Sequence, residues 1–247
     1  DQNMTNKAAI VTGGGTGIGK STSLLLASKG FKVVVNYSRS AKDAEDTCSE
    51  IIKLGGQAIP FKADVSNDQQ VRDMAKQCAS LFGGIDVLVN NAGTTHFIEH
   101  TDLEALTDQV WDDIFSVNMK GTFYACRAVM PELKKSKGNI VNVTSVAGLA
   151  GNGSSMPYAM SKAALNCMTK SLAKSFAPDV RVNAVAPGPV LTRWLKPHPK
   201  MIEQSLALTP MKRASTGEDI AAAIVFLATG TNLMTGQVVV VDGGRTM

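Results

Sequence analysis

Short apolar runs alternate with longer amphipathic stretches along almost the whole chain. The apolar runs are nearly continuous in Val and Ile, which is typical of strands covered on both faces of a sheet. The longer stretches have helical spacing, and glycine follows two of them, where a left-handed helix cap favours it. The predicted strands are residues 8–11, 32–36, 57–64, 86–90, 139–144, 181–186 and 237–241, and the predicted helices are residues 18–29, 41–54, 68–81, 108–130, 157–176 and 218–229.

This alternation of strand and helix predicts the fold. Strands joined through helices pair in parallel, with right-handed crossovers. We therefore expect an α/β protein with a single-domain Rossmann fold, in which helices cover both faces of a doubly wound parallel sheet of about seven strands. The domain comprises residues 4–247, without a linker or a repeat beyond the strand–helix unit.

One long stretch, residues 187–210, has only a weak pattern. Trp194 and Leu195 are apolar residues in an otherwise polar part of it, so we expect residues 189–210 to form a loop that covers a substrate. The alternative is that both side chains pack on the domain or on a neighbouring subunit.

Composition narrows the choice of partners. The 247 residues include 25 Lys and Arg against 21 Asp and Glu, a net charge of +4 with no long run of one sign, whereas nucleic-acid binding usually needs a clustered basic face. The longest apolar run, residues 220–228, is about half as long as a membrane span. The four cysteines are far apart, and no charged segment followed by an apolar one opens the chain. We expect a soluble cytoplasmic protein with free thiols and with no nucleic-acid or membrane partner.

A glycine-rich turn follows the first predicted strand. Residues 12–19, T-G-G-G-T-G-I-G, fit the spacing T-G-x-x-x-G-I-G but no register of G-x-G-x-x-G. Backbone N–H groups at a helix N-terminus bind a pyrophosphate, and glycines let it approach closely. A tight structural turn is the alternative. We expect this turn to bind a dinucleotide through Gly13, Thr16, Gly17, Ile18 and Gly19.

The end of the second predicted strand indicates which dinucleotide. An acidic residue about 20 positions after the turn favours NAD, because it binds the ribose 2′-hydroxyl. Here the strand ends in Asn36, Ser38 and Arg39 are close by, and no carboxylate occurs before Asp43. An arginine offers paired donors and positive charge to a 2′-phosphate, so we expect NADP(H). Alternatively, Arg39 is a solvated loop residue.

Three further residues carry candidate chemistry. Ser145 follows the fifth predicted strand, and Tyr158 and Lys162 share one face of the next helix at i and i+4. Carbonyl reduction needs a proton donor at the oxygen as a hydride reaches the carbon. The ordinary tyrosine pKa of about 10 is too high, but a lysine ammonium stabilises the phenolate and a serine hydroxyl can hold the substrate oxygen. A Tyr-x-x-x-Lys pair alone is weak evidence; together with the glycine turn it predicts a carbonyl reductase.

Further motifs complete the pattern of a known family. They are N-N-A-G at residues 90–93, Asn118 within S-V-N-M-K-G, Pro187-Gly188 followed by Thr192, and D-G-G at residues 242–244. With these motifs the chain resembles the short-chain dehydrogenase/reductase family from its first strand to its last, and it is most similar to the 3-oxoacyl-[acyl-carrier-protein] reductase branch. Two features depart from that branch: residues 93–118 form a slightly longer stretch than usual, and the sequence of residues 189–199 is its own.

The resemblance implies roles for the matching residues. Tyr158 is the expected general acid and base, Lys162 binds the nicotinamide ribose and tunes Tyr158, and Ser145 orients the carbonyl. Asn118 is expected to hold a water between Lys162 and a proton relay. The other implied cofactor contacts are Asp64 and Val65 at the adenine, Asn91, Ala92 and Gly93 in the cleft, and Pro187, Gly188, Val190 and Thr192 toward the nicotinamide amide. Taken singly, Asn118 and Asp64 could instead be caps. The family also implies a homotetramer built partly on the helices that bear Asn118 and Tyr158.

Residues 96–100, H-F-I-E-H, match a zinc motif. That motif needs a helix with both imidazoles on one face and a third ligand, whereas this segment follows a strand end. We therefore expect no metal. His96 and Trp194 are instead predicted to contact the substrate, together with Ser145 and Tyr158.

The expected activity is NADP(H)-dependent reduction of a ketone, a 3-oxoacyl thioester, to a secondary alcohol, on a small-molecule or carrier-bound substrate. The alternatives are a glucose-type sugar dehydrogenase or another small-carbonyl reductase, and a regulator that binds NADPH without chemistry. The catalytic set argues against the regulator, because a sensor needs no tuned phenol. The cluster Lys134, Lys135 and Lys137 is either a solvated face or a contact for an acidic carrier protein.

Overall fold

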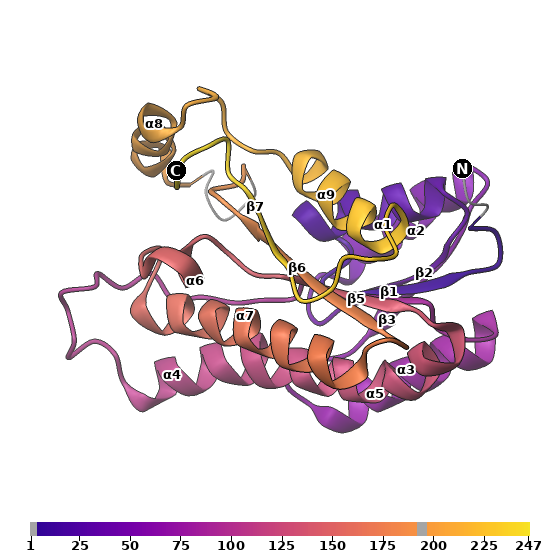
Figure 1. Cartoon of the computed structure of the whole chain (residues 1–247). Helices are drawn as coiled ribbons and strands as arrows, with labels where there is room; N and C mark the ends of the chain where they lie inside the picture. Colours follow the sequence, from indigo (N-terminus) through magenta and orange to yellow (C-terminus); the bar gives the residue numbers. More distant parts are fainter. Residues whose placement is uncertain (1–3, 192–196) are drawn as a thin grey trace.

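The computed structural model describes residues 4–191 and 197–247. Within them, parallel strands form one seven-stranded sheet in the order β3-β2-β1-β4-β5-β6-β7 (Figure 1). The doubly wound α/β fold predicted from the sequence is therefore confirmed. The strands are β1 Ala8–Val11, β2 Lys32–Tyr37, β3 Gln57–Lys62, β4 Val87–Asn90, β5 Asn139–Val143, β6 Arg181–Pro187 and β7 Val238–Val241.

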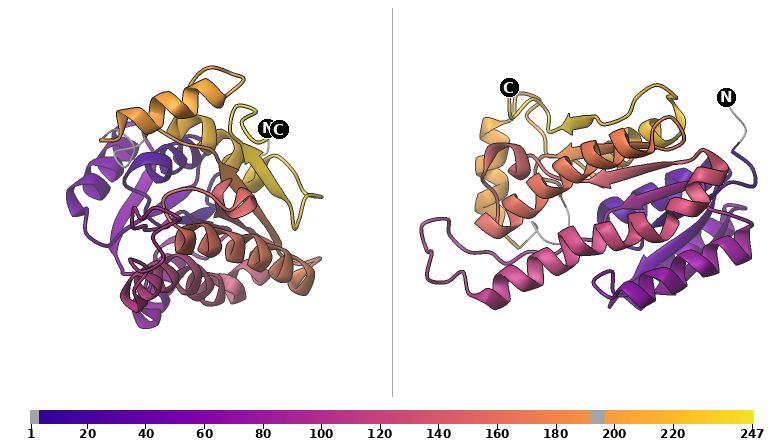
Figure 2. Two further views of the ribbon diagram at one scale, coloured as in Figure 1. Left: turned by 90° about the vertical axis from the view of Figure 1, so that its left-hand side faces the viewer. Right: turned by 60° about the horizontal axis from the view of Figure 1, so that its bottom comes forward.

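Helices cover both faces of the sheet, as Figures 1 and 2 show. Side chains of α1, α2 and α9 share one buried aliphatic cluster with the sheet, and those of α3, α5 and α7 share the other. This two-sided burial explains why the strands are nearly continuous in Val and Ile. The helices are α1 Gly17–Ser28, α2 Ala41–Lys53, α3 Asp68–Phe82, α4 Asp108–Phe115, α5 Thr122–Ser136, α6 Ala147–Ala150, α7 Met156–Phe176, α8 Pro199–Leu208 and α9 Gly217–Thr229, with a π-helical segment at Ser116–Gly121.

The predicted helix 108–130 is interrupted. The chain widens into π-helical turns at Ser116–Gly121 and returns to α-helix until Ser136. The π-helical turn brings Asn118 into a fully buried position, from which its amide bonds to the loop after β4 and to α7. Apolar periodicity does not report one extra residue in a helical turn, and such turns occur frequently at functional sites.

Two other features refine the sequence analysis. The weakly patterned stretch 187–210 contains the helix α8, which begins at Pro199, a residue suited to the first turn of a helix. The four cysteines are free thiols, as expected. None of the helices in the described part of the chain is long and apolar enough to cross a membrane.

The order of the strands determines where a site can form. β1 pairs with β2 on one side and with β4 on the other, so the chain leaves the sheet in opposite directions after these central strands. A crevice opens at the carboxyl ends of the strands at such a switch point. The glycine-rich turn follows β1, and the N-N-A-G motif lies at the end of β4.

Candidate active site

A cleft of about 1230 Å³ runs along the carboxyl edge of the sheet. Segments that follow all seven strands contribute to its lining. It brings together Ser145 and nearly all of the predicted cofactor residues. Those cofactor residues are Gly13, Thr16, Gly17, Ile18, Asn36, Ser38, Arg39, Asp64, Val65, Asn91, Ala92, Gly93, Tyr158, Lys162, Pro187, Gly188 and Val190. Thr192 and Trp194 lie outside the described residues.

Glycine is required at different positions of the first turn for different structural reasons. Gly13 and Gly17 have φ angles of +57° and +51°, in the left-handed region that favours glycine. Gly19 lies behind the cleft, where a Cβ atom would come within 2.0 Å of the Gly13 carbonyl oxygen and 2.6 Å of the Asn91 side chain. The turn therefore has room for a ligand on its open side and none for a side chain at Gly19.

The N-terminus of α1 is suited to a pyrophosphate. Thr16 is the N-cap residue, yet its side chain makes no capping bond, and the first turn holds no acidic residue. Side chains cap α3, α4, α7 and α9 but not α2 or α8, so the missing cap indicates an anion site only together with the glycine turn. Free N–H groups and the positive end of a helix dipole bind anions. The glycine cradle and this uncapped helix fit the diphosphate of a dinucleotide.

Asn36 braces this turn from β2. Its Oδ1 accepts a hydrogen bond from Gly13 N at 3.1 Å, and its Nδ2 donates to the carbonyl oxygen of Ala63 at 3.1 Å. The side-chain amide thus joins the glycine turn to the end of β3 and is 2% exposed. Ser38 and Arg39 are exposed and line the cleft, so they are the polar side chains left free to contact a ribose or its phosphate.

The side chains of Thr12 and Asn91 join the segments that follow β1 and β4 at the central crevice. The Thr12 hydroxyl oxygen accepts hydrogen bonds from the backbone N–H groups of Asn91 and Ala92, both at 3.0 Å. The Asn91 side chain donates to the carbonyl oxygens of Thr12 and Gly13 at 3.2 and 3.1 Å. The segments after β1 and β4 therefore form one fixed floor of the cleft.

Ser145, Tyr158 and Lys162 meet in the cleft. Ser155 caps α7 by accepting a hydrogen bond from the Tyr158 N–H at 3.2 Å, which places Tyr158 in the first turn. Lys162 follows one turn later and lies beneath the phenol, with its Nζ 5.6 Å from the centre of the Tyr158 ring. Nζ donates to the carbonyl oxygen of Val143 at 3.1 Å. Strand β5 thus positions both Ser145 and the lysine.

Burial shifts the acid–base properties of this group. It lowers the pKa of Lys162 to about 8, because an ammonium loses its hydration in the protein interior. Burial also raises the pKa of Tyr158, opposite to the lowering expected from Lys162, while a hydrogen bond with Ser145 acts to lower it. Perturbed titratable groups that converge in a cleft are typical of active sites.

Hydrogen bonds link Asn118 to this group through Thr94 and Ser161. Its Oδ1 accepts from Thr94 N at 2.8 Å, and its Nδ2 donates to Thr94 O and to Ser161 Oγ, each at 3.0 Å. Ser161 in turn donates to the carbonyl oxygen of Tyr158. A Cβ built on Gly93 would lie 3.4 Å from Asn118 Oδ1 and 3.5 Å from Lys162 Nζ, which shows how closely these residues approach. The role of Asn118 in a water-mediated relay stays a prediction.

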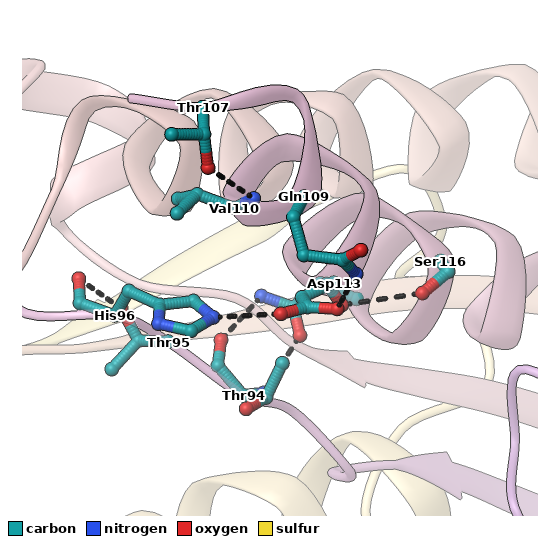
Figure 3. A network of polar contacts seen from close by, with 9 residues as sticks. Thr94, Thr95, His96, Thr107, Gln109, Val110, Asp113 and Ser116 are labelled. Atoms are coloured by element: carbon teal, nitrogen blue, oxygen red, sulfur yellow. Dashed lines mark hydrogen bonds and ion pairs between the residues drawn. The ribbon is translucent and has the colours of Figure 1, made fainter. Parts of the chain in front are cut away.

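Figure 3 shows where His96 points. Its Nε2 lies 3.0 Å from a carboxylate oxygen of Asp113, on α4, and Gln109 donates to the other oxygen. His96 is not among the described residues that line the cleft, so its substrate contact stays a prediction. His100 instead faces the carbonyl oxygen of Gly153 at 3.1 Å, so the two imidazoles of the H-x-x-E-H motif bond to different elements.

The loop after β4 also contacts the segment before α7. Thr95 Oγ1 lies 2.5 Å from Ser154 Oγ, and Ile98 N donates to the Ser154 carbonyl oxygen. Phe97 lines the cleft and contacts the ring of His198, just before α8, with 4.9 Å between ring centres. The cleft also contains residues that were not among the predicted site residues: Thr94, Thr95, Phe97, Ser154, Gln204, Ser205, Leu208, Arg245, Thr246 and Met247.

Comparisons with known proteins agree with this geometry. The family model described as enoyl-(acyl carrier protein) reductase matches residues 13–246. The 3-oxoacyl-[acyl-carrier-protein] reductase of Synechocystis sp. is 41% identical over 248 aligned positions, covering 99% of this chain and 98% of that protein. Ketoacyl reductase 2 of the granaticin polyketide synthase of Streptomyces violaceoruber, as that protein is described, is 41% identical over 243 positions, covering 96% of this chain and 94% of that protein. A crystal structure from Burkholderia xenovorans, described as a short-chain dehydrogenase/reductase, matches with a TM-score of 0.92 at 34% identity and covers 99% of both chains.

The chain therefore belongs to the short-chain dehydrogenase/reductase family, as the resemblance implied. This is a family of oxidoreductases that bind a nicotinamide cofactor. The glycine cradle and the uncapped helix are what such a cofactor requires.

Proposed function

We propose that this protein reduces a ketone to a secondary alcohol with NADP(H), and that the ketone is a 3-oxoacyl thioester. The observation that carries the proposal is the convergence of Ser145, Tyr158 and Lys162 on one cleft with a dinucleotide cradle. A site for binding alone needs no phenol hydrogen-bonded to a serine above a buried ammonium, which argues against a pure NADPH sensor.

Each side chain has a definable task. A bound nicotinamide supplies the hydride to the carbonyl carbon. The Tyr158 hydroxyl donates its proton to the carbonyl oxygen, and the Ser145 hydroxyl holds that oxygen by a hydrogen bond. The Lys162 ammonium stabilises the phenolate left on Tyr158. Because Val143 holds Nζ in place, the charge sits close to where the phenolate forms.

The preference for NADP(H) rests on the loop after β2. Arg39 lines the cleft and makes no ion pair with any residue in the described ranges, so its guanidinium is available to a 2′-phosphate. The carboxylate of Asp64, at the end of β3, instead accepts hydrogen bonds from the backbone and hydroxyl of Ser66. These features support a phosphate-binding corner.

The thioester substrate rests on the relatives. The proteins that this chain resembles at 41% identity are described as a 3-oxoacyl-[acyl-carrier-protein] reductase and a ketoacyl reductase. The family model is named for an enoyl reductase, which reduces a carbon–carbon double bond, so that reaction belongs in the test. A carrier protein as substrate donor, a homotetramer and a cytoplasmic location remain predictions.

A substrate panel tests the proposal. Purified protein is assayed with NADPH and with NADH against acetoacetyl-N-acetylcysteamine, its crotonyl analogue and cyclohexanone, and with NADP⁺ and with NAD⁺ against glucose. We expect oxidation of NADPH with the acetoacetyl thioester and none with the crotonyl analogue. Turnover of glucose or cyclohexanone alone would favour the alternative reductases. Tight NADPH binding without turnover of any carbonyl would favour a regulator.

A further inference from the structure

Arg245 adds a third positively charged side chain to the cleft lining, in addition to Arg39 and Lys162. It follows β7 and lines the cleft together with Gln204 and Ser205 of α8. Its guanidinium donates to Ser205 Oγ at 2.5 Å and forms no ion pair with a residue that the structure describes. Most of its five donor N–H groups are therefore free for a ligand.

The charges of the cleft are unbalanced. Asp64 is the only carboxylate side chain among the described lining residues, and it already accepts two hydrogen bonds from Ser66. Arg39 and Lys162 have tasks in the proposed function, whereas Arg245 has none. A half-buried guanidinium that faces a cleft and has no ion-pair partner among the described residues favours an anionic ligand there.

The tail that carries Arg245 is held in a defined conformation. The Asp242 carboxylate, 7% exposed, accepts hydrogen bonds from Gly244 N at 2.9 Å and from the N–H and hydroxyl of Thr246 at 2.9 and 2.7 Å. Gly243 and Gly244 have φ angles of +66° and +88°. The D-G-G motif thus folds the chain back and directs the residue after it toward α8, beside which the C-terminus lies in Figure 1.

The strand order places Arg245 far from the adenine end of the cleft. Arg39 follows β2 and Arg245 follows β7, five strands apart in the sheet. With strands about 4.8 Å apart, their carboxyl ends are separated by roughly 24 Å. Ser145 follows β5, and Gly188, at the end of β6, lies against Asp242. Arg245 therefore lies beyond the reaction centre, on the side opposite the proposed 2′-phosphate contact.

We propose that Arg245, with Ser205 and Gln204, binds an anionic group of the ketone substrate. The chemistry is that of a phosphate or a carboxylate, which a guanidinium binds through paired, charge-assisted hydrogen bonds. The inference rests on the proposed carbonyl reduction and narrows its substrates to ketones that carry a negative charge. A phosphate on the arm of a thioester and a carboxylate on a short oxo acid are the two sources.

Pairs of one charged and one neutral ketone test whether Arg245 recognises the negative charge of the substrate. We compare acetoacetyl-coenzyme A with acetoacetyl-N-acetylcysteamine, and levulinate with its methyl ester. Arg245→Ala is expected to raise KM about tenfold or more for the anionic member of at least one pair, and less than about twofold for both neutral members, as loss of a charge-assisted hydrogen bond predicts. Arg245→Lys is expected to raise KM for the anionic substrate less than Arg245→Ala does, because it retains the positive charge. Lys200→Ala is the control, because Lys200 is an exposed cation on α8 outside the cleft lining.

The outcomes decide the proposal and identify the source. A loss confined to acetoacetyl-coenzyme A indicates a phosphate, and one confined to levulinate indicates a carboxylate. Equal losses for charged and neutral substrates, or a matching rise in KM for NADPH, would overturn the proposal. Calorimetric titration of coenzyme A against pantetheine, with NADP⁺ present, tests the anion site without turnover. There, coenzyme A binding that depends on Arg245 supports a phosphate site even if no thioester is reduced. The same titration of levulinate against its methyl ester tests a carboxylate site, and binding of both anions that is indifferent to Arg245 overturns the proposal.

Discussion

The Nζ atom of Lys162 lies 5.6 Å from the centre of the Tyr158 ring while it donates a hydrogen bond to the backbone of β5. Lys162 is 5% exposed and forms no ion pair within the described ranges, so its charge is not neutralised by a carboxylate. A buried, unpaired ammonium has an energetic cost, and proteins retain such groups mostly at functional sites. In the proposed mechanism this ammonium has a function, because it stabilises the phenolate that Tyr158 leaves when it donates its proton.

The pKa of Lys162 predicts the pH dependence of the reaction. Because burial lowers this pKa to about 8, the ammonium is present below that pH and is lost above it. Tyr158 remains a protonated donor over the same range, because burial raises its pKa. We expect kcat/KM for ketone reduction to fall as the pH rises through about 8, as measured by NADPH oxidation. A rate that rises steadily above that pH would contradict this assignment.

Arg39→Ala tests the choice of cofactor. A charge-assisted hydrogen bond contributes about 1.5–3 kcal/mol, so Kd for NADPH should rise roughly 10- to 100-fold while Kd for NADH changes little. Fluorescence titration of both cofactors measures this. Lys42→Ala is the matched control, since Lys42 is an exposed neighbour that pairs with Asp46 and does not line the cleft. Equal losses for the two cofactors would show that Arg39 does not contact the 2′-phosphate.

Asn118→Ala tests whether the π-helical segment supports catalysis. The change removes three hydrogen bonds from a buried side chain to Thr94 and Ser161 and should lower the free energy of unfolding by about 1–3 kcal/mol. We also expect kcat to fall by about tenfold or more in protein that is still folded, because the segments beside Lys162 lose their shared anchor. Gln109→Ala, at an exposed position of α4, is the control. A thermal shift with unchanged kcat would limit Asn118 to a structural role.

Asp219 links α9 to the segment after α8. It accepts two hydrogen bonds from Arg213 and completes a capping box with Thr216, and these contacts hold its pKa well below its usual range. A lowered carboxyl pKa stabilises the fold above the unfolded-state value and loses that effect as the pH falls. Asp219→Asn should therefore destabilise the protein by about 1 kcal/mol near neutral pH and by less toward about pH 3.

Thermal melts over this pH range measure the difference. Asp46→Asn, which breaks an exposed pair, serves as the control. A destabilisation that grows as the pH falls would contradict the linkage.

The periodicity and the motifs of the sequence were sufficient to predict the fold and the residues at the centre of the candidate site. Continuous Val and Ile runs predicted the buried parallel strands, and the spacing of the glycines, Tyr158 and Lys162 located residues that do line one cleft. These signals are local, because each motif sits at a strand end or on one helix face.

Other features depend on contacts between distant segments. The bonds from Asn36 to the glycine turn and to β3 join residues 23 to 27 positions apart, and no pattern indicates that its amide is already engaged. Arg245 reaches Ser205 across 40 positions. The D-G-G motif precedes Arg245 and can be recognised in the sequence. That it holds Arg245 in position cannot be recognised there, because this depends on how the Asp242 carboxylate folds the C-terminal residues back.

Tyr158→Phe tests the central claim most directly. The substitution removes one oxygen atom, and with it the proton donor, from a side chain held in place by α7. Single-turnover oxidation of NADPH with the acetoacetyl thioester is compared with NADPH binding in the same protein. We predict that the single-turnover rate constant falls about 10²- to 10⁴-fold while NADPH binds as before. Turnover at the wild-type rate in this variant would contradict the account.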